Sequence, residues 1–151
     1  MTRTMPKSTD RSLFDDFLPH LITRLAYQLN NDLIEKLRRE SITVTRWRIL
    51  AVLAMGDGIS ITEVTDRAMM QQSALSRALM SMEAEGYVLR VLRRADARYV
   101  EVFLTQKGRA LFDSLNIVVR RRQKRLLQGF APRERAAAFE VIRRLSRNMT
   151  R

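Results

Sequence analysis

The residues best suited to specific chemistry in this chain are polar side chains in one short segment, residues 71–82. Apolar positions there follow the i, i+3, i+4, i+7 spacing of one buried helix face, formed by Leu75, Ala78, Leu79 and Met82. The opposite face carries Gln71, Gln72, Ser73, Ser76, Arg77 and Met80. Gln bonds adenine bidentately, Arg bonds guanine, and Ser suits bases or phosphates. The segment therefore predicts a helix that reads base edges and ends at Gly86 in a left-handed C-cap.

A basic stretch follows this helix between residues 89 and 103. Apolar residues alternate on both sides of residues 95–97, a pattern that predicts a β-hairpin with its turn at that point. The hairpin, or wing, would carry the charged residues Arg93, Arg94, Asp96 and Arg98. Asp96 can hold an arginine through a charge-assisted hydrogen bond. An arginine at the tip can enter a minor groove and read its width, and the alternative is a surface hairpin with solvated arginines.

The charge balance favours the same kind of partner. The chain has 151 residues, a length that suits one compact domain or one domain that dimerises. Its 28 Lys and Arg residues against 16 Asp and Glu residues give a formal net charge of +12. The pI of about 11.3 is typical of a protein that binds nucleic acid. A soluble protein with a solvated cationic surface would have the same composition.

Several classes of protein are disfavoured by what the sequence lacks. It has no cysteine and a single histidine, His20, so we expect no disulfide, no metal and no other cofactor. It shows no nucleophile–base constellation and no Gly-rich phosphate loop, so we expect no enzymatic activity. No apolar run approaches the roughly 20 residues that span a membrane, and no apolar core follows the basic N-terminus. We therefore expect a cytoplasmic protein without a membrane partner.

Long amphipathic helices flank the central segment. Residues 13–40 predict a helix with one apolar face, in which Pro19 marks the first turn of the main segment. Residues 109–151 predict two helices, broken near Pro132, each again with an apolar stripe. These stripes exceed what a small monomer must bury, so we expect the first and last helices to interlock in a homodimer. Residues 1–12 would form a flexible basic arm.

Residues 41–108 are expected to form the unit that carries the polar helix and the wing. Thr43 predicts the N-cap of one helix. A helix over residues 59–68 follows, with Ser60 and Glu63 in the S-x-x-E pattern of a capping box. Met69-Met70 would form the short turn into the polar helix, which makes the pair a helix-turn-helix.

A small-molecule site is a further hypothesis from the first helices. Polar groups interrupt the apolar pattern of the first helix at His20, Arg24, Tyr27 and Gln28, and the candidate pocket lies near His20, Arg24, Tyr27 and Trp47. Buried polar groups must be hydrogen-bonded to protein or to a ligand. An arginine between aromatic walls would suit an aromatic carboxylate. The alternative is a satisfied helix interface, with Trp47 in the core.

The motifs together resemble those of the MarR-type family of winged helix-turn-helix regulators. The marks are Ile42-Thr43 ahead of Trp47-Arg48-Ile49-Leu50, Ser73 to Arg77, Met82-Glu83 with Gly86-Tyr87-Val88, and Asp96-x-Arg98 running into Leu104-Thr105-x-x-Gly108. The resemblance covers the chain from about Phe14 to Met149. The chain departs from the family pattern at Met69-Met70, where a small residue or glycine is common in the turn. The chain lacks the cysteine of the family's peroxide-sensing branch and the histidine set of its zinc-sensing branch.

The resemblance implies a fold and a function. The fold would be mainly α with a small β-hairpin, a winged helix-turn-helix with N- and C-terminal dimerisation helices. The function would be that of a homodimeric repressor on a pseudo-palindromic operator in double-stranded DNA, relieved by a small aromatic or phenolic acid. Ser73, Ser76 and Arg77 would meet the major groove, and Arg98 would enter or brace the minor groove. The alternative is a module of the same fold that binds nucleic acid non-specifically or binds an acidic protein.

Overall fold

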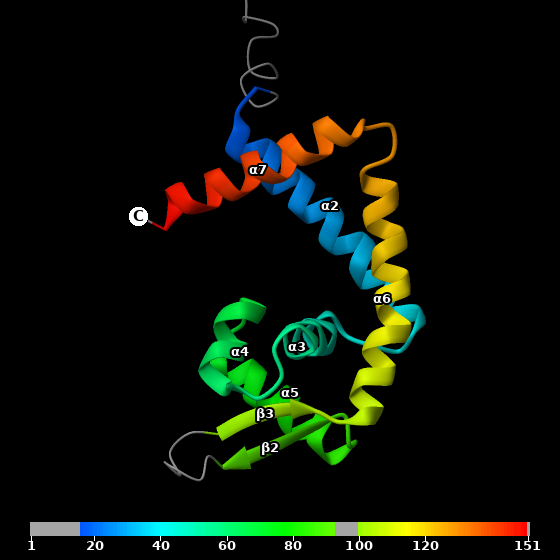
Figure 1. Ribbon diagram of the computed structural model, residues 1–151, viewed down its shortest axis with the longest axis vertical. Helices are drawn as coiled ribbons and strands as arrows, with labels where there is room; N and C mark the ends of the chain where they lie inside the picture. The colour runs from blue at the N-terminus through cyan, green and yellow to red at the C-terminus, as the bar shows by residue number, and fades with distance from the viewer. Residues whose placement is uncertain (1–15, 93–99, 151) are drawn as a thin grey trace, which may run out of the picture. The chain divides into compact units, whose positions relative to one another are not determined.

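The computed structural model describes residues 16–92 and 100–150, and the chain forms two compact units, Met1–Leu115 and Asn116–Arg151. The first unit contains α2 (Leu18–Arg39), α3 (Val44–Met55), β1 (Ile59–Ser60), α4 (Ile61–Ala68), α5 (Gln72–Ala84), β2 (Val88–Leu92) and β3 (Val100–Leu104) (Figure 1). α6 (Gln106–Leu126) begins in the first unit and continues into the second, which also contains α7 (Pro132–Met149). The predicted arm, residues 1–12, lies outside the described residues.

The helix boundaries follow the local signals of the sequence. Thr43 accepts a hydrogen bond from the Arg46 N–H at 3.3 Å and caps α3, and Ser60 accepts from the Glu63 N–H at 3.1 Å and caps α4. Pro19 lies in the first turn of α2, as predicted. These caps satisfy donors that would otherwise lack partners at the helix ends.

The C-terminal end of α5 also follows the sequence. Gly86 has a φ of +75°, and the Tyr87 N–H donates to the Met82 carbonyl at 2.8 Å. The left-handed cap predicted at Gly86 is therefore confirmed.

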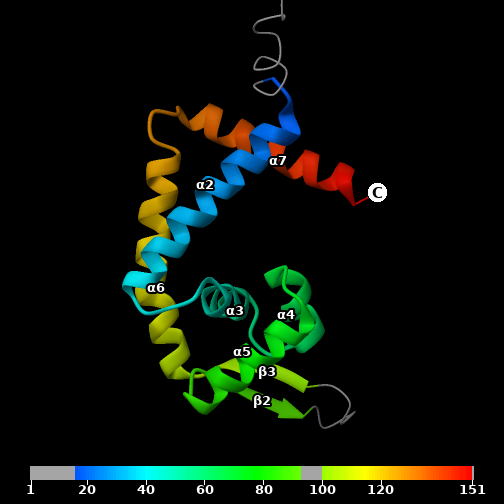
Figure 2. The ribbon, with the colours of Figure 1, turned by 180° about the vertical axis from the view of Figure 1, so that it is seen from behind.

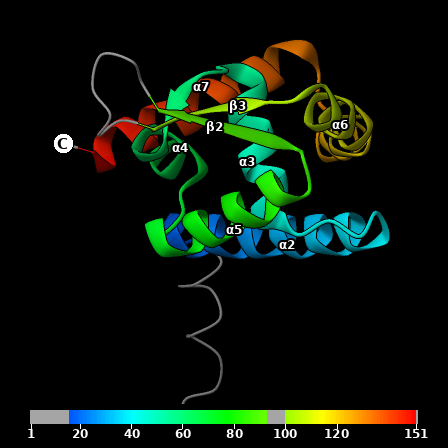
Figure 3. The ribbon, with the colours of Figure 1, turned by 90° about the horizontal axis from the view of Figure 1, so that it is seen from below.

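The β-sheet has three antiparallel strands in the order β1-β3-β2. β2 and β3 are the expected hairpin stems, with Val88 opposite Leu104 (Figure 3). The third strand was not predicted, because Ile59 and Ser60 were expected to begin a helix. Instead Ile59 pairs with Val102, and the helix begins at Ile61. A strand of two residues is too short to show alternation, so its pairing is visible only in three dimensions.

The core of the first unit lies between the helices and the sheet. Trp47 is 8 % exposed and stacks on Phe112, with ring centroids 5.5 Å apart and planes 6° apart. The predicted apolar face of α5 is buried at Leu75, Leu79 and Met82, while Ala78 is partly exposed. Other fully buried side chains come from six further elements, and include Leu37, Ile49, Leu50, Leu53, Val64, Val88, Val102 and Leu115. Burial of each large aliphatic side chain contributes about 1.5–3 kcal/mol, so this cluster dominates the stability of the unit.

The apolar stripes of α2 and α7 are exposed in the single chain. On α7, Val141 is 51 % and Ile142 53 % exposed, and none of the α7 residues is buried. On α2, Leu18 and Leu25 are 49 % and 44 % exposed. The sequence predicts that a second subunit covers these stripes, and in the single chain the buried residues of α2 are Leu33 and Leu37.

None of the helices in residues 16–92 and 100–150 is both long and apolar enough to cross a membrane.

The start of α6 rests closely on the end of α5 and the start of β2. The Thr105 hydroxyl donates to the Gly86 carbonyl at 2.7 Å and accepts from the Gly108 N–H at 3.0 Å. A Cβ at position 108 would lie 2.1 Å from the Tyr87 carbonyl oxygen, which is rigid backbone. Glycine is therefore required at this position by close approach.

We expect Gly108→Ala to lower the free energy of unfolding by about 3 kcal/mol, because the added methyl group forces two backbone segments apart. Gly86→Ala is the matched control: nothing lies within 4 Å of its Cβ position, and only the positive φ opposes a side chain. That strain costs about 1–2 kcal/mol. Urea unfolding of both variants measures the difference. A Gly108→Ala protein as stable as Gly86→Ala would contradict the close approach.

Candidate nucleic-acid interface

The exposed face of α5 is built from polar side chains. The residues on it are Gln71, Gln72, Ser73, Ser76, Arg77 and Met80, and all six are exposed. The predicted division of this helix into a buried apolar face and an exposed polar face is thus observed. Their side chains include amide, hydroxyl and guanidinium donors and no carboxylate, a composition suited to base edges and phosphates.

The N-terminus of α5 differs from those of α3 and α4. Gln71 is the N-cap residue and makes no side-chain cap hydrogen bond. The first intrahelical bond runs from the Leu75 N–H to the Gln71 carbonyl at 3.0 Å, so the preceding amides have no partner within the helix. Amide donors and the partial positive charge of a helix N-terminus favour a phosphate. This end of α5 is therefore suited to a nucleic-acid backbone.

The turn between α4 and α5 contains a methionine with a left-handed backbone conformation. Met69 has φ 51° and ψ 55°, the left-handed region, and is 80 % exposed. The Met70 N–H donates to the Thr65 carbonyl at 3.1 Å, which closes the turn. Most non-glycine residues disfavour this conformation, so a glycine would fit with less strain. After the Met69-Met70 turn, α5 begins at Gln72 with Gln71 as its N-cap.

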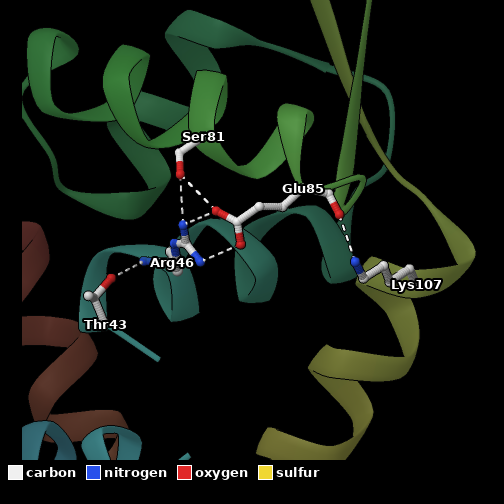
Figure 4. Close-up of polar contacts among 5 residues, drawn as sticks. All are labelled: Thr43, Arg46, Ser81, Glu85 and Lys107. Carbon is white, nitrogen blue, oxygen red and sulfur yellow. Dashed lines mark hydrogen bonds and ion pairs between the residues drawn. The ribbon is translucent and has the colours of Figure 1, made fainter. Parts of the chain in front are cut away.

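A polar clamp, defined here as Arg46, Ser81 and Glu85, joins the first turn of α3 to the last turn of α5 (Figure 4). Arg46 Nη1 donates to Glu85 Oε2 at 2.8 Å, and Arg46 Nη2 donates to Ser81 Oγ at 2.7 Å and also contacts Glu85 Oε1. The Ser81 hydroxyl donates to the same carboxylate at 2.8 Å. The hydrogen bond from Arg46, followed by that from Ser81, lowers the pKa of the Glu85 carboxyl.

Lys107, in the first turn of α6, extends this contact to the next element. Its Nζ donates to the Glu85 carbonyl at 2.7 Å (Figure 4). The same Nζ lies 4.5 Å from the centre of the Tyr87 ring. An ammonium over an aromatic face is attracted by the ring quadrupole. The end of α5 is therefore fastened to both α3 and α6. Sequence reasoning missed Arg46, Glu85 and Lys107, because these contacts join residues far apart in the chain.

A second ion pair fastens α5 to β2. Arg90 Nε donates to Glu83 Oε2 at 2.7 Å, and the Arg90 backbone N–H donates to Glu83 Oε1 at 3.1 Å. The side-chain hydrogen bond from Arg90 is the largest cause of the lowered pKa of the Glu83 carboxyl, and burial opposes it. Both carboxylates near the end of α5 thus face a guanidinium, which offsets negative charge that would repel a polyanion.

The predicted wing residues are Arg93, Arg94, Asp96 and Arg98, and all four lie outside the described residues. β2 and β3 lead into and out of that segment, and their pairing extends to Leu92 opposite Val100. The predicted roles of the four charged residues remain predictions.

The four predicted ligand residues occupy different environments. His20, Arg24 and Tyr27 are exposed on α2, while Trp47 is buried against Phe112. A hollow of about 550 Å³ lies between α2 and the start of α3, and none of the four lines it. Its lining residues are Asn30, Ile34, Arg38, Ile42, Thr43, Val44, Thr45 and Arg48. Within the part of the chain that the structure describes, no group of three His, Cys, Asp or Glu side chains is placed to hold a metal ion.

Comparison with known proteins identifies relatives for the sequence. The sequence model of the MarR family matches residues 41–98. The HTH-type transcriptional regulator TtmR of Methylorubrum extorquens is 36 % identical over 75 residues, which are 50 % of this chain and 38 % of TtmR. The homoprotocatechuate degradative operon repressor of Escherichia coli is 32 % identical over 76 residues, 50 % of this chain and 51 % of the repressor. The matched segment therefore spans about half or less of these relatives.

Solved structures match over nearly the whole chain. A MarR-family transcriptional regulator from Silicibacter pomeroyi is 30 % identical, with a TM-score of 0.83, and the match covers 94 % of this chain and 96 % of that one. BpsR of Bordetella bronchiseptica, whose DNA binding is regulated by 6-hydroxynicotinic acid, is 25 % identical with a TM-score of 0.73. That match covers 85 % of this chain and 98 % of BpsR.

The fold, the family match and these relatives agree. The relatives are transcriptional regulators and not enzymes. Along the chain, α2 precedes the helix-turn-helix of α4 and α5, and the β2–β3 hairpin, α6 and α7 follow it, which is the order that the motifs predicted. The chain belongs to the MarR family of winged helix-turn-helix, DNA-binding transcriptional regulators.

Proposed function

We propose that this protein is a cytoplasmic repressor that binds a pseudo-palindromic operator as a homodimer, with one α5 and one wing on each half-site. The observation that carries the proposal is α5 itself: a polar, carboxylate-free face is exposed, and the N-cap side chain leaves the first amides available. A helix with these properties suits the major groove, where it reads base edges and contacts phosphates at once. Two of its relatives are repressors, which supports repression rather than activation.

The exposed stripes on α2 and α7 support the dimer. Apolar side chains of this size are rarely left in a continuous exposed row, and a second copy of the chain would cover them. Residues 13–40 and 109–151 would then dimerise, residues 41–108 would bind DNA, and residues 1–12 would remain a flexible basic arm. A two-fold axis would place the two α5 helices on half-sites about 34 Å apart.

The proposed contacts with DNA fall into two groups, those of α5 and those of the wing. Gln71, Gln72, Ser73, Ser76 and Arg77 would meet the major groove. Arg93, Arg94, Asp96 and Arg98 would form the wing contacts, and the resemblance implies that Arg98 enters or braces the minor groove. Phosphate contacts would supply much of the affinity and make it depend on salt, while α5 would supply the choice of sequence.

An aromatic or phenolic acid is the proposed effector, as 6-hydroxynicotinic acid is for the relative BpsR. To release DNA, the effector must bind the free dimer more tightly than the DNA-bound dimer. We place the site near His20, Arg24, Tyr27 and Trp47, with Arg24 as the partner of the carboxylate.

Selection of bound sequences from random duplex DNA at fixed physiological salt tests the regulator directly. We expect a pseudo-palindrome with two equivalent half-sites. On that operator Arg77→Ala should weaken binding by about 1–3 kcal/mol and relax the choice of one base pair, because Arg77 is proposed to read a base.

The control is Arg39→Ala, which removes an equally exposed arginine that pairs with Glu35 on α2. Its operator affinity should stay close to that of the unchanged protein. Binding that depends on salt but not on sequence would support the non-specific module instead. Unchanged affinity and preference in Arg77→Ala would remove the base-reading role.

The ion pairs that hold α5 predict that the stability of the folded protein depends on pH. The folded-state pKa values of Glu83 and Glu85 are lowered below 4.5 by their guanidinium partners. Their contribution to stability is therefore complete above the unfolded pKa and is lost as the pH falls through the folded pKa. We expect urea unfolding, followed by Trp47 fluorescence, to shift to lower urea between about pH 5 and pH 3, and to shift less in the Glu83→Gln, Glu85→Gln double variant.

Glu35→Gln is the matched control, since Glu35 forms an exposed i,i+4 pair on α2 that contributes little. It should follow the unchanged protein across this pH range. A double variant with the same acid sensitivity as the unchanged protein would show that these two contacts do not hold α5.

Aromatic acids should change the fluorescence of Trp47, the only tryptophan in the chain. We expect 6-hydroxynicotinic acid or a related acid to bind, and Arg24→Ala to weaken that binding about tenfold by removing the partner of the carboxylate. Arg39→Ala should bind the acid as before. A flat fluorescence titration together with no heat in calorimetry would eliminate the site.

A further inference from the structure

The positive charge of this protein lies mostly outside the unit that carries α5. Residues 116–151 contain eleven Lys and Arg residues against two Asp and Glu residues, a formal net charge of +9. Residues 1–115 contain seventeen against fourteen, a net charge of +3. Three quarters of the total of +12 therefore belong to the second unit, which the proposed operator contacts do not use.

Part of this charge converges on one hollow at the corner between α6 and α7. Figure 2 shows the turn that joins these two helices. The hollow measures about 470 Å³ and is lined by Arg121, Lys124, Arg125, Gln128, Gly129 and Arg135. Three of these residues, Arg121, Lys124 and Arg125, lie on α6 at i, i+3 and i+4, which places them on one face of the helix, and Gln128 follows the end of α6. Arg135 comes from the first turns of α7, so cations from two helices line the same space.

The backbone of this corner is held in place. Arg135 Nε donates to the Phe130 carbonyl at 2.8 Å, which anchors the guanidinium beside the turn. Gly129 has a φ of +85°, and the Phe130 N–H donates to the Leu127 carbonyl at 3.3 Å. The corner therefore presents its cations from a defined turn.

The acidic residues of the second unit have other partners. Glu134 accepts the Ala131 N–H at 2.7 Å at the start of α7, and Glu140 pairs with Arg147. Two carboxylates cannot offset eleven cations, and side chains of like charge within a Debye length of about 8 Å repel one another. An anion of several charges in the hollow would relieve that repulsion.

We propose that the α6–α7 hollow binds a small molecule that carries several phosphate groups, such as an oligophosphate or a nucleoside triphosphate. Guanidinium groups match phosphate oxygens bidentately, and lysine adds a point charge. The volume lies within the range of small-molecule sites. Duplex DNA spreads its charge evenly along an axis, whereas these cations converge from two helices on one hollow, an arrangement that fits a compact anion better.

Calorimetry of the full chain with inorganic tripolyphosphate, and then with ATP, tests the proposal at about 0.15 M ionic strength. The Arg121→Gln, Lys124→Gln double variant should lose at least about tenfold in affinity. The Arg143→Gln, Arg144→Gln double variant removes the same charge from α7 outside this hollow and should stay within about twofold.

Three results would overturn the proposal. An equal loss in both double variants would mean diffuse attraction to the charged unit, and no binding of either phosphate compound would mean no site. A loss of random-sequence duplex binding in the Arg121→Gln, Lys124→Gln variant, with tripolyphosphate binding unchanged, would assign the hollow to DNA. Arg77→Ala separates this site from the proposed operator contacts, since it should leave tripolyphosphate affinity unchanged whatever it does to operator binding.

Discussion

Burial of one face of α5 is the constraint on which the rest of the first unit depends. Leu75, Leu79 and Met82 are fully buried, so the opposite, polar face of the helix is the one exposed to solvent. The clamp of Arg46, Ser81 and Glu85 and the pair of Glu83 with Arg90 contribute less energy, because partly exposed ion pairs are screened by water. Their effect is directional: apolar burial fixes which face points outward, and the ion pairs fix how the helix lies against α3 and β2.

The parts of this fold that follow from the sequence are those governed by local chemistry. Thr43, Ser60 and Gly86 act on neighbouring residues, so their cap roles are visible in the pattern. The Arg46–Glu85 contact joins residues 39 positions apart, and β1 pairs with β3 through only two residues. No spacing rule reaches across such distances. The exposed face of α5 was predictable for the same reason as its buried face, because both follow from one helical period.

Composition pointed toward nucleic acid, but the distribution of charge shows that composition alone was an incomplete argument. The unit with α5 has a net charge of only +3, so its suitability for DNA rests on the kinds of side chain on one helix face and on the amides at its N-terminus. The larger excess lies in residues 116–151. A single net charge for the chain cannot distinguish a surface that reads sequence from one that holds a compact anion.

The same charge bears on the proposed dimer, because two copies of the second unit would bring +9 and +9 together. At a protein surface in salt, each close pair of like charges costs on the order of 1 kcal/mol, and the cost falls off beyond a Debye length of about 8 Å. Burying a side chain such as Val141, Ile142 or Leu25 contributes about 1.5–3 kcal/mol. Several such residues are exposed along α2 and α7, so the proposed dimer requires that their burial outweigh the repulsion in salt. A bound oligophosphate would reduce the repulsion further, and the proposed hollow and the proposed dimer would then stabilise each other.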